Sequence, residues 1–214
     1  MQKPACRGLY AITDTLLLPD QQRLIVAVEQ AILGGARLIQ YRDKSTDADR
    51  RLTQAQALHA LCRRYEIPLI INDDVELAAQ VGAAGVHIGR GDPDLTTARA
   101  CLGETALIGV SCYDRLDLAR AAERAGADYV AFGAFFPSPT KPTEVRASLE
   151  LLREGRAVLH VPIVAIGGIT SDNAPLLLEA GADALAVVSG VFGQPDIQTA
   201  ARRYAALFVG GIPS

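Results

Sequence analysis

A short phrase recurs along the chain: a helix-compatible stretch, then a glycine-alanine pair, then a brief apolar run. Its four copies precede the apolar runs at residues 38–39, 86–88, 129–130 and 184–186. Glycine just past a helix can adopt the left-handed backbone conformation that turns the chain sharply into a strand. Because these runs lack strict alternation of apolar and polar residues, they are typical of parallel strands buried on both faces.

Further apolar segments complete a set of eight predicted strands, namely residues 8–13, 68–72, 106–111 and 162–167. Each predicted strand is followed by a segment that can form a helix. Polar residues such as Thr46 before Ala48, and Asp114 before Leu116, are suited to cap those helices.

Strict alternation of strands and helices gives a parallel sheet, and eight such units in 214 residues favour a closed barrel. The alternative is an open doubly wound sheet, but Thr13-Asp14 stands where such a sheet carries GxGxxG. We therefore predict an α/β protein, a single (β/α)8 TIM barrel over residues 1–214, with a frayed tail at 210–214.

The composition is that of an ordinary globular protein, with 50% hydrophobic residues, 21% charged residues and a formal net charge of −3. This balance gives no reason to expect nucleic acid or an acidic membrane as a partner, so the positive charge for an anionic ligand must be local. No apolar run reaches the ~18 residues that a membrane helix needs, and the N-terminus lacks the pattern of a signal peptide.

The four cysteines form neither a CxxC pair nor a zinc-binding pattern. We expect free, buried thiols, which suit a reducing cytosol, and hence a cytoplasmic protein. The sequence does not fix the oligomeric state, and a homo-oligomer is compatible with it.

The second predicted strand ends in Gln40-Tyr41-Arg42-Asp43-Lys44. A period of two places Gln40 and Arg42 on the barrel interior and Tyr41 toward the helices. Catalytic groups of such barrels lie at the carboxyl ends of strands. An arginine at the barrel mouth requires an anionic partner, which is either a ligand or, as the alternative, the carboxylate of Asp43 or Asp73.

Aspartates follow the next two predicted strands, at Asp73 and Asp92. Since neighbouring strand ends lie close together, both carboxylates could bind one Mg²⁺ whose remaining ligands come from a substrate phosphate. The alternative for Asp92 is a helix cap, and for Asp74 the cap is the preferred interpretation.

Ser111, after the fifth predicted strand, could hydrogen-bond a ligand or stabilise a turn. The neighbouring Cys112 is expected to be a core residue because no activating base stands near it in the sequence. The histidines His59, His87 and His160 lack metal-ligand spacing, and each is expected to be structural.

Two kinds of phosphate-binding loop follow the later strands. Ser138, Thr140 and Lys141 lie among three prolines after the sixth strand, where hydroxyls and a lysine can bind phosphate, although an ordinary polar loop is the alternative. Gly167-Gly168 follow the seventh strand and Val188-Ser189-Gly190 the eighth. Backbone N–H groups can approach an anion there, and loops after strands 7 and 8 are the recurrent phosphate site of this barrel class.

Eight phrases, in order and each at a predicted strand end, resemble the thiamine-phosphate synthase family along essentially the whole chain: YAITD, QYRDK, INDDVELA, GVHIG, IGVSC, PSPTK, AIGGIT and AVVSG. The resemblance implies a transferase that couples 4-amino-2-methyl-5-(diphosphooxymethyl)pyrimidine with 4-methyl-5-(2-phosphooxyethyl)thiazole, or its carboxylated form. The products would be thiamine phosphate and diphosphate. The same resemblance implies Mg²⁺ as the cofactor, with small phosphorylated substrates and no nucleic-acid or membrane partner.

The resemblance also assigns roles to residues. The site for the pyrimidine diphosphate would comprise Gln40, Tyr41, Arg42, Asp43, Lys44, Asn72, Ser111 and Lys141, of which Arg42, Lys44, Ser111 and Lys141 are the candidate catalytic residues. The Mg²⁺ ligands would be Asp73 and Asp92. The thiazole phosphate would be held by Ser138, Pro139, Thr140, Gly168, Val188 and Ser189. Arg90 stands where the family commonly has glutamine and could pair with Asp92; Ser138, where the family often has threonine, keeps a hydroxyl.

These residues suggest an order of events. Diphosphate leaves readily only when its growing charge is neutralised, which the cationic side chains and Mg²⁺ would do. Because an aminopyrimidine stabilises a cation at its exocyclic CH₂, we expect ionisation first and attack by the thiazole nitrogen second. No side-chain nucleophile is required.

Three other functions compete with this one. A thiazole tautomerase of the same superfamily carries a histidine just after strand 6, where this chain has Ala134, and lacks the aspartate metal site. A non-catalytic barrel that binds thiamine precursors would need no group to neutralise diphosphate. A barrel of the aldolase type would need a Schiff-base lysine within a strand, and no predicted strand carries one.

Overall fold

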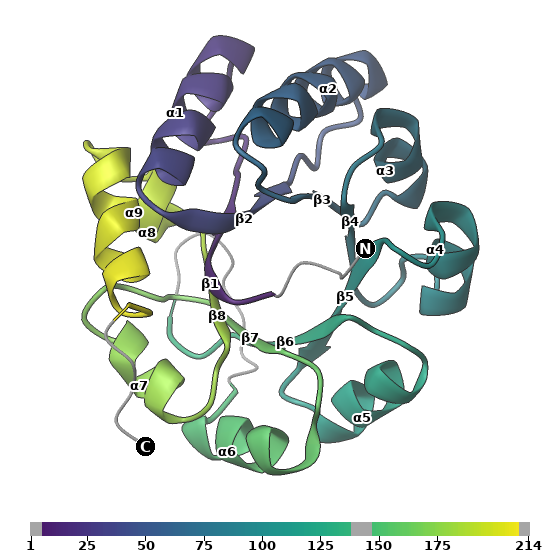
Figure 1. Cartoon of the computed structure of the whole chain (residues 1–214), viewed down its shortest axis with the longest axis vertical. Helices are drawn as coiled ribbons and strands as arrows, with labels where there is room; N and C mark the ends of the chain where they lie inside the picture. The colour runs from purple at the N-terminus through teal and green to yellow at the C-terminus, as the bar shows by residue number, and fades with distance from the viewer. Residues whose placement is uncertain (1–5, 138–146, 210–214) are drawn as a thin grey trace.

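The computed structural model describes residues 6–137 and 147–209, and within them eight parallel strands close into a barrel in sequence order (Figure 1). The strands are β1 (Gly8–Ile12), β2 (Ala36–Tyr41), β3 (Leu69–Asn72), β4 (Gly85–Ile88), β5 (Leu107–Tyr113), β6 (Tyr129–Gly133), β7 (Ile163–Ile166) and β8 (Ala184–Val187). Pairing of β1 with both β2 and β8 closes the sheet. The predicted TIM barrel is confirmed, and the open sheet is excluded.

The helices form a ring outside the strands (Figure 1). They are α1 (Gln21–Leu33), α2 (Ala48–Arg64), α3 (Val75–Val81), α4 (Leu95–Leu102), α5 (Leu116–Arg124), α6 (Leu149–Val158), α7 (Ala174–Glu179), α8 (Ser189–Phe192) and α9 (Ile197–Ala206). Among the described residues, no helix combines the length and the hydropathy required to span a membrane. The tail predicted at 210–214 lies outside the described residues, and the cytoplasmic location stays a prediction.

Aspartate caps start several helices, because a carboxylate can accept a bond from a first-turn amide that has no partner within the helix. The predicted caps were close but wrong. Asp47, not Thr46, caps α2 by accepting from Arg50 N, and α5 follows Arg115, which makes no side-chain cap. The glycine of each repeated phrase has positive φ, at Gly35, Gly82, Gly126 and Gly181, as predicted for the turn into a strand.

The apolar side chains form two layers. One fills the barrel interior and includes Tyr10, Leu38, Ile70, Tyr129 and Val164; the other lies between strands and helices. Alternation along β2 follows from the pleat, and it confirms the predicted inward and outward faces of that strand.

The cysteines are all free. Cys6, Cys62 and Cys112 are buried as expected, and burial raises the pKa of Cys112 to about 12, which suits a core thiol. The expectation of buried thiols is wrong for Cys101, which is exposed on α4.

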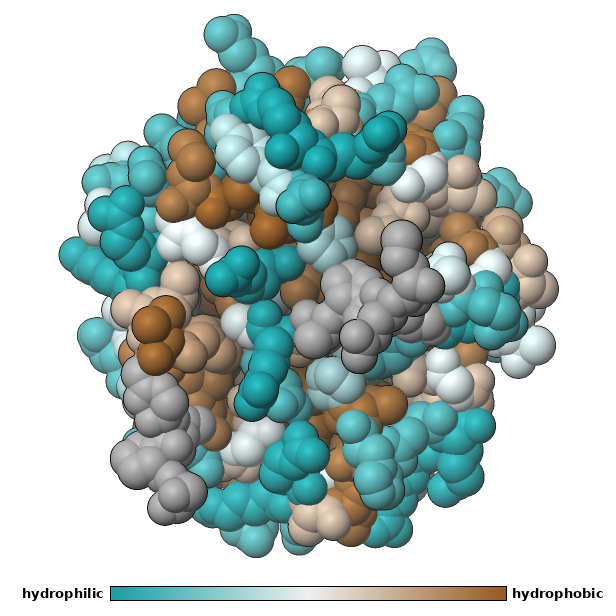
Figure 2. All heavy atoms as spheres, in the orientation of Figure 1, coloured by the Kyte–Doolittle hydropathy of each residue, from teal (hydrophilic) through white to brown (hydrophobic). Residues whose placement is uncertain are grey.

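On the face drawn in Figure 2, hydrophilic side chains are interspersed with smaller hydrophobic areas. Large exposed hydrophobic side chains in the described part of the chain are Leu16, Val26, Leu33, Leu176 and Val209, of which only Val26 and Leu33 share a helix, α1. Scattered exposed apolar residues of this kind are normal for a protein surface.

Candidate active site

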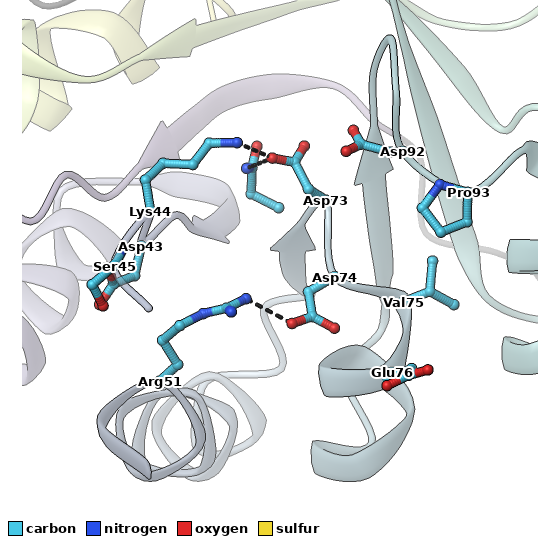
Figure 3. A pocket seen from close by; sticks show the side chains of 11 residues that line it. Asp43, Lys44, Ser45, Arg51, Asp73, Asp74, Val75, Glu76, Asp92 and Pro93 are labelled. Carbon is cyan, nitrogen blue, oxygen red and sulfur yellow. Dashed lines mark hydrogen bonds and ion pairs between the residues drawn. The ribbon is translucent and has the colours of Figure 1, made fainter. Parts of the chain in front are cut away.

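The carboxyl ends of β2, β3 and β4 surround an open cavity of roughly 420 Å³ (Figure 3). Its lining residues are Asp43, Lys44, Ser45, Arg51, Asn72, Asp73, Asp74, Val75, Glu76, Asp92 and Pro93. They lie in or next to three consecutive strand-to-helix connections, with Arg51 on α2 and Val75 and Glu76 at the start of α3. Such connections are where this barrel class places its functional groups.

Asp73 is the centre of the polar contacts in this cavity. Its Oδ2 accepts a hydrogen bond from Asn72 Nδ2 at 2.7 Å and also forms an ion pair with Lys44 (Figure 3). Burial would raise the pKa of Asp73, but the hydrogen bond and charge of Lys44, together with Asp92, hold that pKa below its ordinary value. Asp73 is therefore an ionised carboxylate already neutralised by a lysine.

The backbone of Asp73 is unusual as well. Its φ is 64°, a left-handed conformation that disfavours a residue with a Cβ, and its N–H donates to the carbonyl of His87 at 2.8 Å. Sparsely populated conformations of this kind persist where the surrounding structure holds them, and they cluster at functional sites. The turn at the end of β3 thus directs the carboxylate toward the cavity.

Asp92 faces Asp73 across the cavity (Figure 3). It accepts a hydrogen bond from Gly89 N at 2.7 Å. Burial raises the pKa of Asp92, and the Asp73 carboxylate raises it further, against the opposing effect of the Gly89 N–H. The two carboxylates thus influence each other's ionisation, as two neighbouring like charges do.

Asp74 caps a helix and Asp92 does not. Asp74 caps α3 by accepting from Leu77 N at 2.8 Å, as predicted, and also pairs with Arg51. Asp92 is not a cap, because α4 is capped by Asp94. Its carboxylate instead lines the cavity and accepts the hydrogen bond from Gly89 N.

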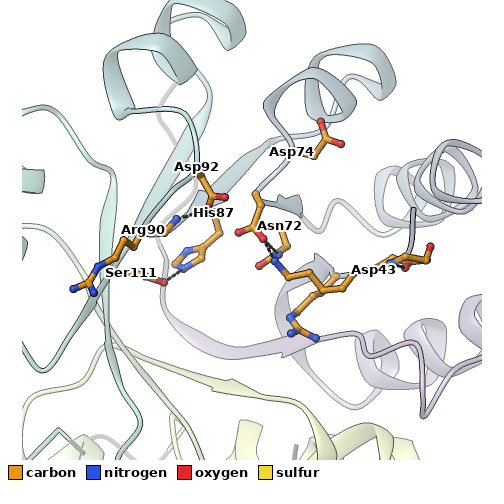
Figure 4. A network of polar contacts seen from close by, with 12 residues as sticks. Asp43, Asn72, Asp74, His87, Arg90, Asp92 and Ser111 are labelled. Atoms are coloured by element: carbon orange, nitrogen blue, oxygen red, sulfur yellow. Dashed lines mark hydrogen bonds and ion pairs between the residues drawn. The ribbon is translucent and has the colours of Figure 1, made fainter. Parts of the chain in front are cut away.

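Arg90 does not pair with Asp92, contrary to the expectation from sequence. Its guanidinium lies over the ring of Tyr113, 5.3 Å from the centroid, and its backbone N–H donates to the Tyr113 hydroxyl at 3.0 Å. Figure 4 shows the guanidinium directed away from Asp92. Arg90 therefore does not neutralise the Asp92 carboxylate.

Arg42 has a partner that the sequence did not suggest. Its Nη1 lies 3.4 Å from Oδ2 of Asp14, and its backbone N–H donates to Thr13 Oγ1 at 2.9 Å. The alternative partners, Asp43 and Asp73, are wrong, because Asp14 takes that place, whereas a ligand as the partner of Arg42 stays a prediction. Asp14 lies two residues after the end of β1, so the rule that selected the other strand-end residues could have found it.

Tyr41 and Asp43 are directed to the helical side of β2. The Tyr41 hydroxyl donates to Gln54 Oε1 on α2 at 2.9 Å, and the Asp43 carboxylate accepts from Ser45 N at 2.7 Å and pairs with Arg50. Burial raises the pKa of Tyr41 well above its ordinary value. These contacts stabilise the connection that carries Lys44, and direct substrate binding by Tyr41 and Asp43 stays a prediction.

A chain of hydrogen bonds crosses the barrel interior beneath the cavity. Gln40 Nε2 donates to the Tyr10 hydroxyl at 2.7 Å, and the Tyr10 and Tyr129 hydroxyls are 2.8 Å apart. His87 Nδ1 lies 3.1 Å from the Tyr129 hydroxyl. On the other side of the ring, His87 Nε2 lies 2.8 Å from Ser111 Oγ (Figure 4).

His87 was expected to be merely structural. Burial lowers its pKa to about 4, although the Asp73 charge acts in the opposite direction. The neutral ring touches Ser111, which the resemblance places at the substrate. The available signal was the alternation along β4, which turns His87 inward between Val86 and Ile88.

The glycine-rich connection after β7 is held close to the end of β6. Gly168 has φ 65°, and a Cβ at this residue would lie 2.5 Å from the carbonyl oxygen of Pro137. Asn173 Nδ2 donates to the Gly168 carbonyl at 3.0 Å. Only glycine suits both the conformation and the close approach.

Val188 precedes α8, and Ser189 is the first residue of that short helix. First-turn amides of a helix have no partner within it. A short extra helix after the eighth strand is where barrels of this class commonly bind phosphate. The remaining predicted phosphate ligands, Ser138, Pro139, Thr140 and Lys141, lie outside the described residues.

The donor set fits Mg²⁺ better than a transition metal. Two facing carboxylates and a carboxamide are hard oxygen ligands, and Mg²⁺ in proteins is usually held by one or two carboxylates with substrate phosphates completing the shell. Over the described ranges, no group of three or more histidine, cysteine, aspartate or glutamate side chains is arranged to hold a metal by itself.

Known proteins are similar to this chain along almost its entire length. A family model described as thiamine monophosphate synthase matches residues 9–191. The thiamine-phosphate synthases of Nitrosococcus oceani and Thioalkalivibrio sulfidiphilus are 58% and 56% identical, over 92% and 94% of this chain and 91% and 95% of their own lengths.

Solved structures extend the comparison. Thiamine phosphate pyrophosphorylase from Pyrococcus furiosus superposes with a TM-score of 0.86 at 34% identity, covering 96% of this chain and 97% of its own. A 3-hexulose-6-phosphate synthase, with a TM-score of 0.69 at 17% identity over 94% of this chain and 99% of its own, shares the fold alone. On the family model and these relatives, the chain belongs to the thiamine-phosphate synthase family of transferases.

Proposed function

We propose that this chain joins 4-amino-2-methyl-5-(diphosphooxymethyl)pyrimidine to 4-methyl-5-(2-phosphooxyethyl)thiazole, releasing diphosphate. The observation that carries the proposal is the cavity in which Asp73 and Asp92 face each other beside Lys44. Two carboxylates and a cation at one point suit a metal-bound diphosphate better than a neutral ligand.

Arg42, Lys44 and Asn72 bind the diphosphate end of the pyrimidine substrate. The Asp14 contact orients the Arg42 guanidinium, and Lys44 lies within reach of any phosphate that also approaches Asp73. Mg²⁺, when bound by Asp73 and Asp92, supplies Lewis-acid stabilisation of the negative charge on the leaving diphosphate. Lys141 is proposed to add a further cation.

In the proposed reaction one C–O bond breaks and one C–N bond forms. The C–O bond to the diphosphate breaks with both electrons leaving on oxygen, and the cation at the exocyclic CH₂ is delocalised into the aminopyrimidine. The lone pair of the thiazole nitrogen then forms the C–N bond of thiamine phosphate. No proton moves in these steps, so the reaction needs neither a side-chain base nor a side-chain nucleophile.

The thiazole is positioned by its phosphate. Gly168, Val188 and Ser189, with Ser138, Pro139 and Thr140, are proposed to hold that phosphate at the ends of β6, β7 and β8. Fixing the thiazole from this side presents its nitrogen to the pyrimidine CH₂, and alignment of two reactants in one cavity is itself a large part of catalysis.

The direct test is incubation of the purified protein with both substrates and Mg²⁺, with chromatographic assay of thiamine phosphate and colorimetric assay of diphosphate. The proposal predicts equal amounts of both products, and none when either substrate is omitted or when a chelator removes Mg²⁺. Consumption of the thiazole by isomerisation alone, without diphosphate release, would instead indicate the tautomerase.

A further inference from the structure

We propose that His87 is a positioning residue: Tyr129 fixes its ring as the Nε2–H tautomer, so that Ser111 presents its hydroxyl hydrogen to the substrate. The proposal rests on the proposed function only for the identity of the ligand, a pyrimidine ring nitrogen. The polarity of the hydrogen-bond chain follows from the orientation of the Gln40 amide, whose Nε2 faces the Tyr10 hydroxyl.

The polarity starts at Gln40. Its Nε2 donates to the Tyr10 hydroxyl, and an amide nitrogen cannot accept a hydrogen bond. The single proton of Tyr10 is therefore directed to its other partner, the Tyr129 hydroxyl at 2.8 Å. Tyr129 has one proton of its own, and the remaining partner for it is Nδ1 of His87 at 3.1 Å.

His87 passes this polarity on to Ser111. An Nδ1 atom that accepts a hydrogen bond carries no proton, so a neutral ring must carry its proton on Nε2. That N–H donates to Ser111 Oγ at 2.8 Å (Figure 4). Ser111 accepts from His87, and its own hydrogen is free for a ligand.

Because the two tyrosines are buried, the protein and not the solvent decides the direction of these hydrogen bonds. Tyr10 is 1% exposed and Tyr129 is fully buried, so their hydroxyls have only each other and the neighbouring side chains as partners. Unsatisfied polar groups in such a place destabilise the fold, which favours one complete chain over broken arrangements.

A glycine in β5, Gly109, leaves the space that the Tyr129 side chain occupies in this hydrogen-bond network. A Cβ at Gly109 would lie 1.9 Å from Cζ of Tyr129 and 2.4 Å from its hydroxyl, so no larger residue fits while Tyr129 is in place. The His87 ring is stacked on the Tyr129 ring, with 5.6 Å between centroids and 21° between planes. Stacking and hydrogen bonding therefore restrict the same imidazole.

The chemical result is a hydroxyl with a free hydrogen. Ser111 in this state can donate to an acceptor such as an unprotonated ring nitrogen of an aminopyrimidine, which it could not do while donating to His87. A chain of opposite polarity, with the Gln40 amide reversed, would place the proton on Nδ1 and turn Ser111 into an acceptor. The tautomer of His87 thus distinguishes the two possibilities.

The test uses the full-length protein labelled with ¹⁵N-histidine. We expect ¹⁵N NMR at pH 7 to show His87 as the neutral Nε2–H tautomer, assigned by loss of its signals in His87→Gln. Tyr129→Phe should change that tautomer pattern. It should also raise the KM for the pyrimidine diphosphate about five- to tenfold, the loss expected for one hydrogen bond, with the KM for the thiazole phosphate unchanged.

The matched control is Tyr65→Phe, which removes a hydroxyl that donates to Glu29 Oε1 at 2.6 Å between helices, away from the cavity. It should leave both readouts unchanged. His87→Gln, whose amide can donate to Ser111, should retain more affinity for the pyrimidine substrate than His87→Leu. Circular dichroism confirms that each variant is folded.

An Nδ1–H or protonated His87 in the unaltered protein, or an unchanged pyrimidine KM in folded Tyr129→Phe, would overturn the proposal. The NMR measurement does not depend on turnover. Failure of the unaltered protein to make thiamine phosphate would therefore refute the proposed function without deciding the tautomer.

Discussion

Asp14 holds the guanidinium of Arg42 at the barrel mouth. One oxygen of the Asp14 carboxylate lies 3.4 Å from Arg42 Nη1, and the other accepts from Leu16 N at 2.9 Å. Asp14 is only 5% exposed, so its carboxylate has a fixed place at the end of β1. The cation that the proposed function assigns to the diphosphate is therefore oriented from the neighbouring strand.

Replacing Arg42 by alanine should cut turnover by about 100-fold, the usual effect of removing one preorganised electrostatic contact to the leaving group. Steady-state kinetics with both substrates measures this, and circular dichroism should show an unchanged fold because the side chain is at the rim. Near-normal coupling by folded Arg42→Ala would remove Arg42 from the diphosphate site.

Asp14→Asn should act through Arg42. The amide oxygen can still accept from Leu16 N, but the charge that orients the guanidinium is lost, so the KM for the pyrimidine diphosphate should rise roughly tenfold. In an Arg42→Ala background the same change should have little further effect. Additive losses in the double variant would show that Asp14 acts independently of Arg42.

Asp92→Asn should weaken the dependence of the reaction on Mg²⁺. The amide oxygen is a poorer ligand than a carboxylate, so the Mg²⁺ concentration for half-maximal rate should increase at least about tenfold, the loss that even an outer-shell partner causes. Asp94→Asn, at the cap of α4 beside the cavity, is the matched control. Equal Mg²⁺ requirements in Asp92→Asn and the unaltered protein would contradict the metal site.

Ser189→Asp should repel the thiazole phosphate. A carboxylate at the first residue of α8 adds a like charge near the proposed phosphate, and the KM for the thiazole should rise about tenfold, or about 1.4 kcal/mol. Gln56→Glu, on the exposed face of α2, makes the same change in net charge and should have no effect. An unchanged thiazole KM would place the phosphate elsewhere.

His87 should make the fold sensitive to mild acid. Its pKa is about 4 in the folded state against 6.5 without burial, so below pH 6.5 the unfolded chain binds more protons than the folded one. The contribution is complete above pH 6.5 and is lost as the pH falls from 6.5 to about 4, to a total of about 3 kcal/mol.

Urea unfolding at several pH values measures that slope. His87→Gln should flatten it, whereas His59→Gln should remove only a small part, because His59 is far less buried, although burial lowers its pKa too. An unchanged slope in His87→Gln would show that His87 is protonated in the folded state or solvated.

The period of hydrophobic positions was enough to predict the barrel and the faces of β2, because burial on both sides of a parallel strand is a local property of the sequence. The same reasoning placed Asp73, Asp92 and Arg42 at strand ends. What it could not supply was the choice among nearby partners. Arg42 pairs with Asp14 rather than Asp43 because the stagger of β1 against β2 decides which carboxylate is in reach.

The chain of hydrogen bonds across the barrel interior was not predicted, for a related reason. Gln40, Tyr10, Tyr129 and His87 belong to four different strands, and each looks like an ordinary core or strand residue when read alone. Only closure of the barrel brings them together. Cap positions were missed by a single residue at Thr46 because the choice between Thr46 and Asp47 depends on backbone geometry that a sequence pattern does not resolve.

The central claim is that one metal-bound diphosphate sits between Asp73 and Asp92. The most direct measurement is anomalous diffraction from crystals grown with the pyrimidine diphosphate and Mn²⁺, which shares the oxygen-ligand preference of Mg²⁺. The account predicts one anomalous peak within coordination distance of both carboxylates and of the diphosphate. A metal peak remote from Asp73 and Asp92, with the diphosphate bound elsewhere, would contradict it.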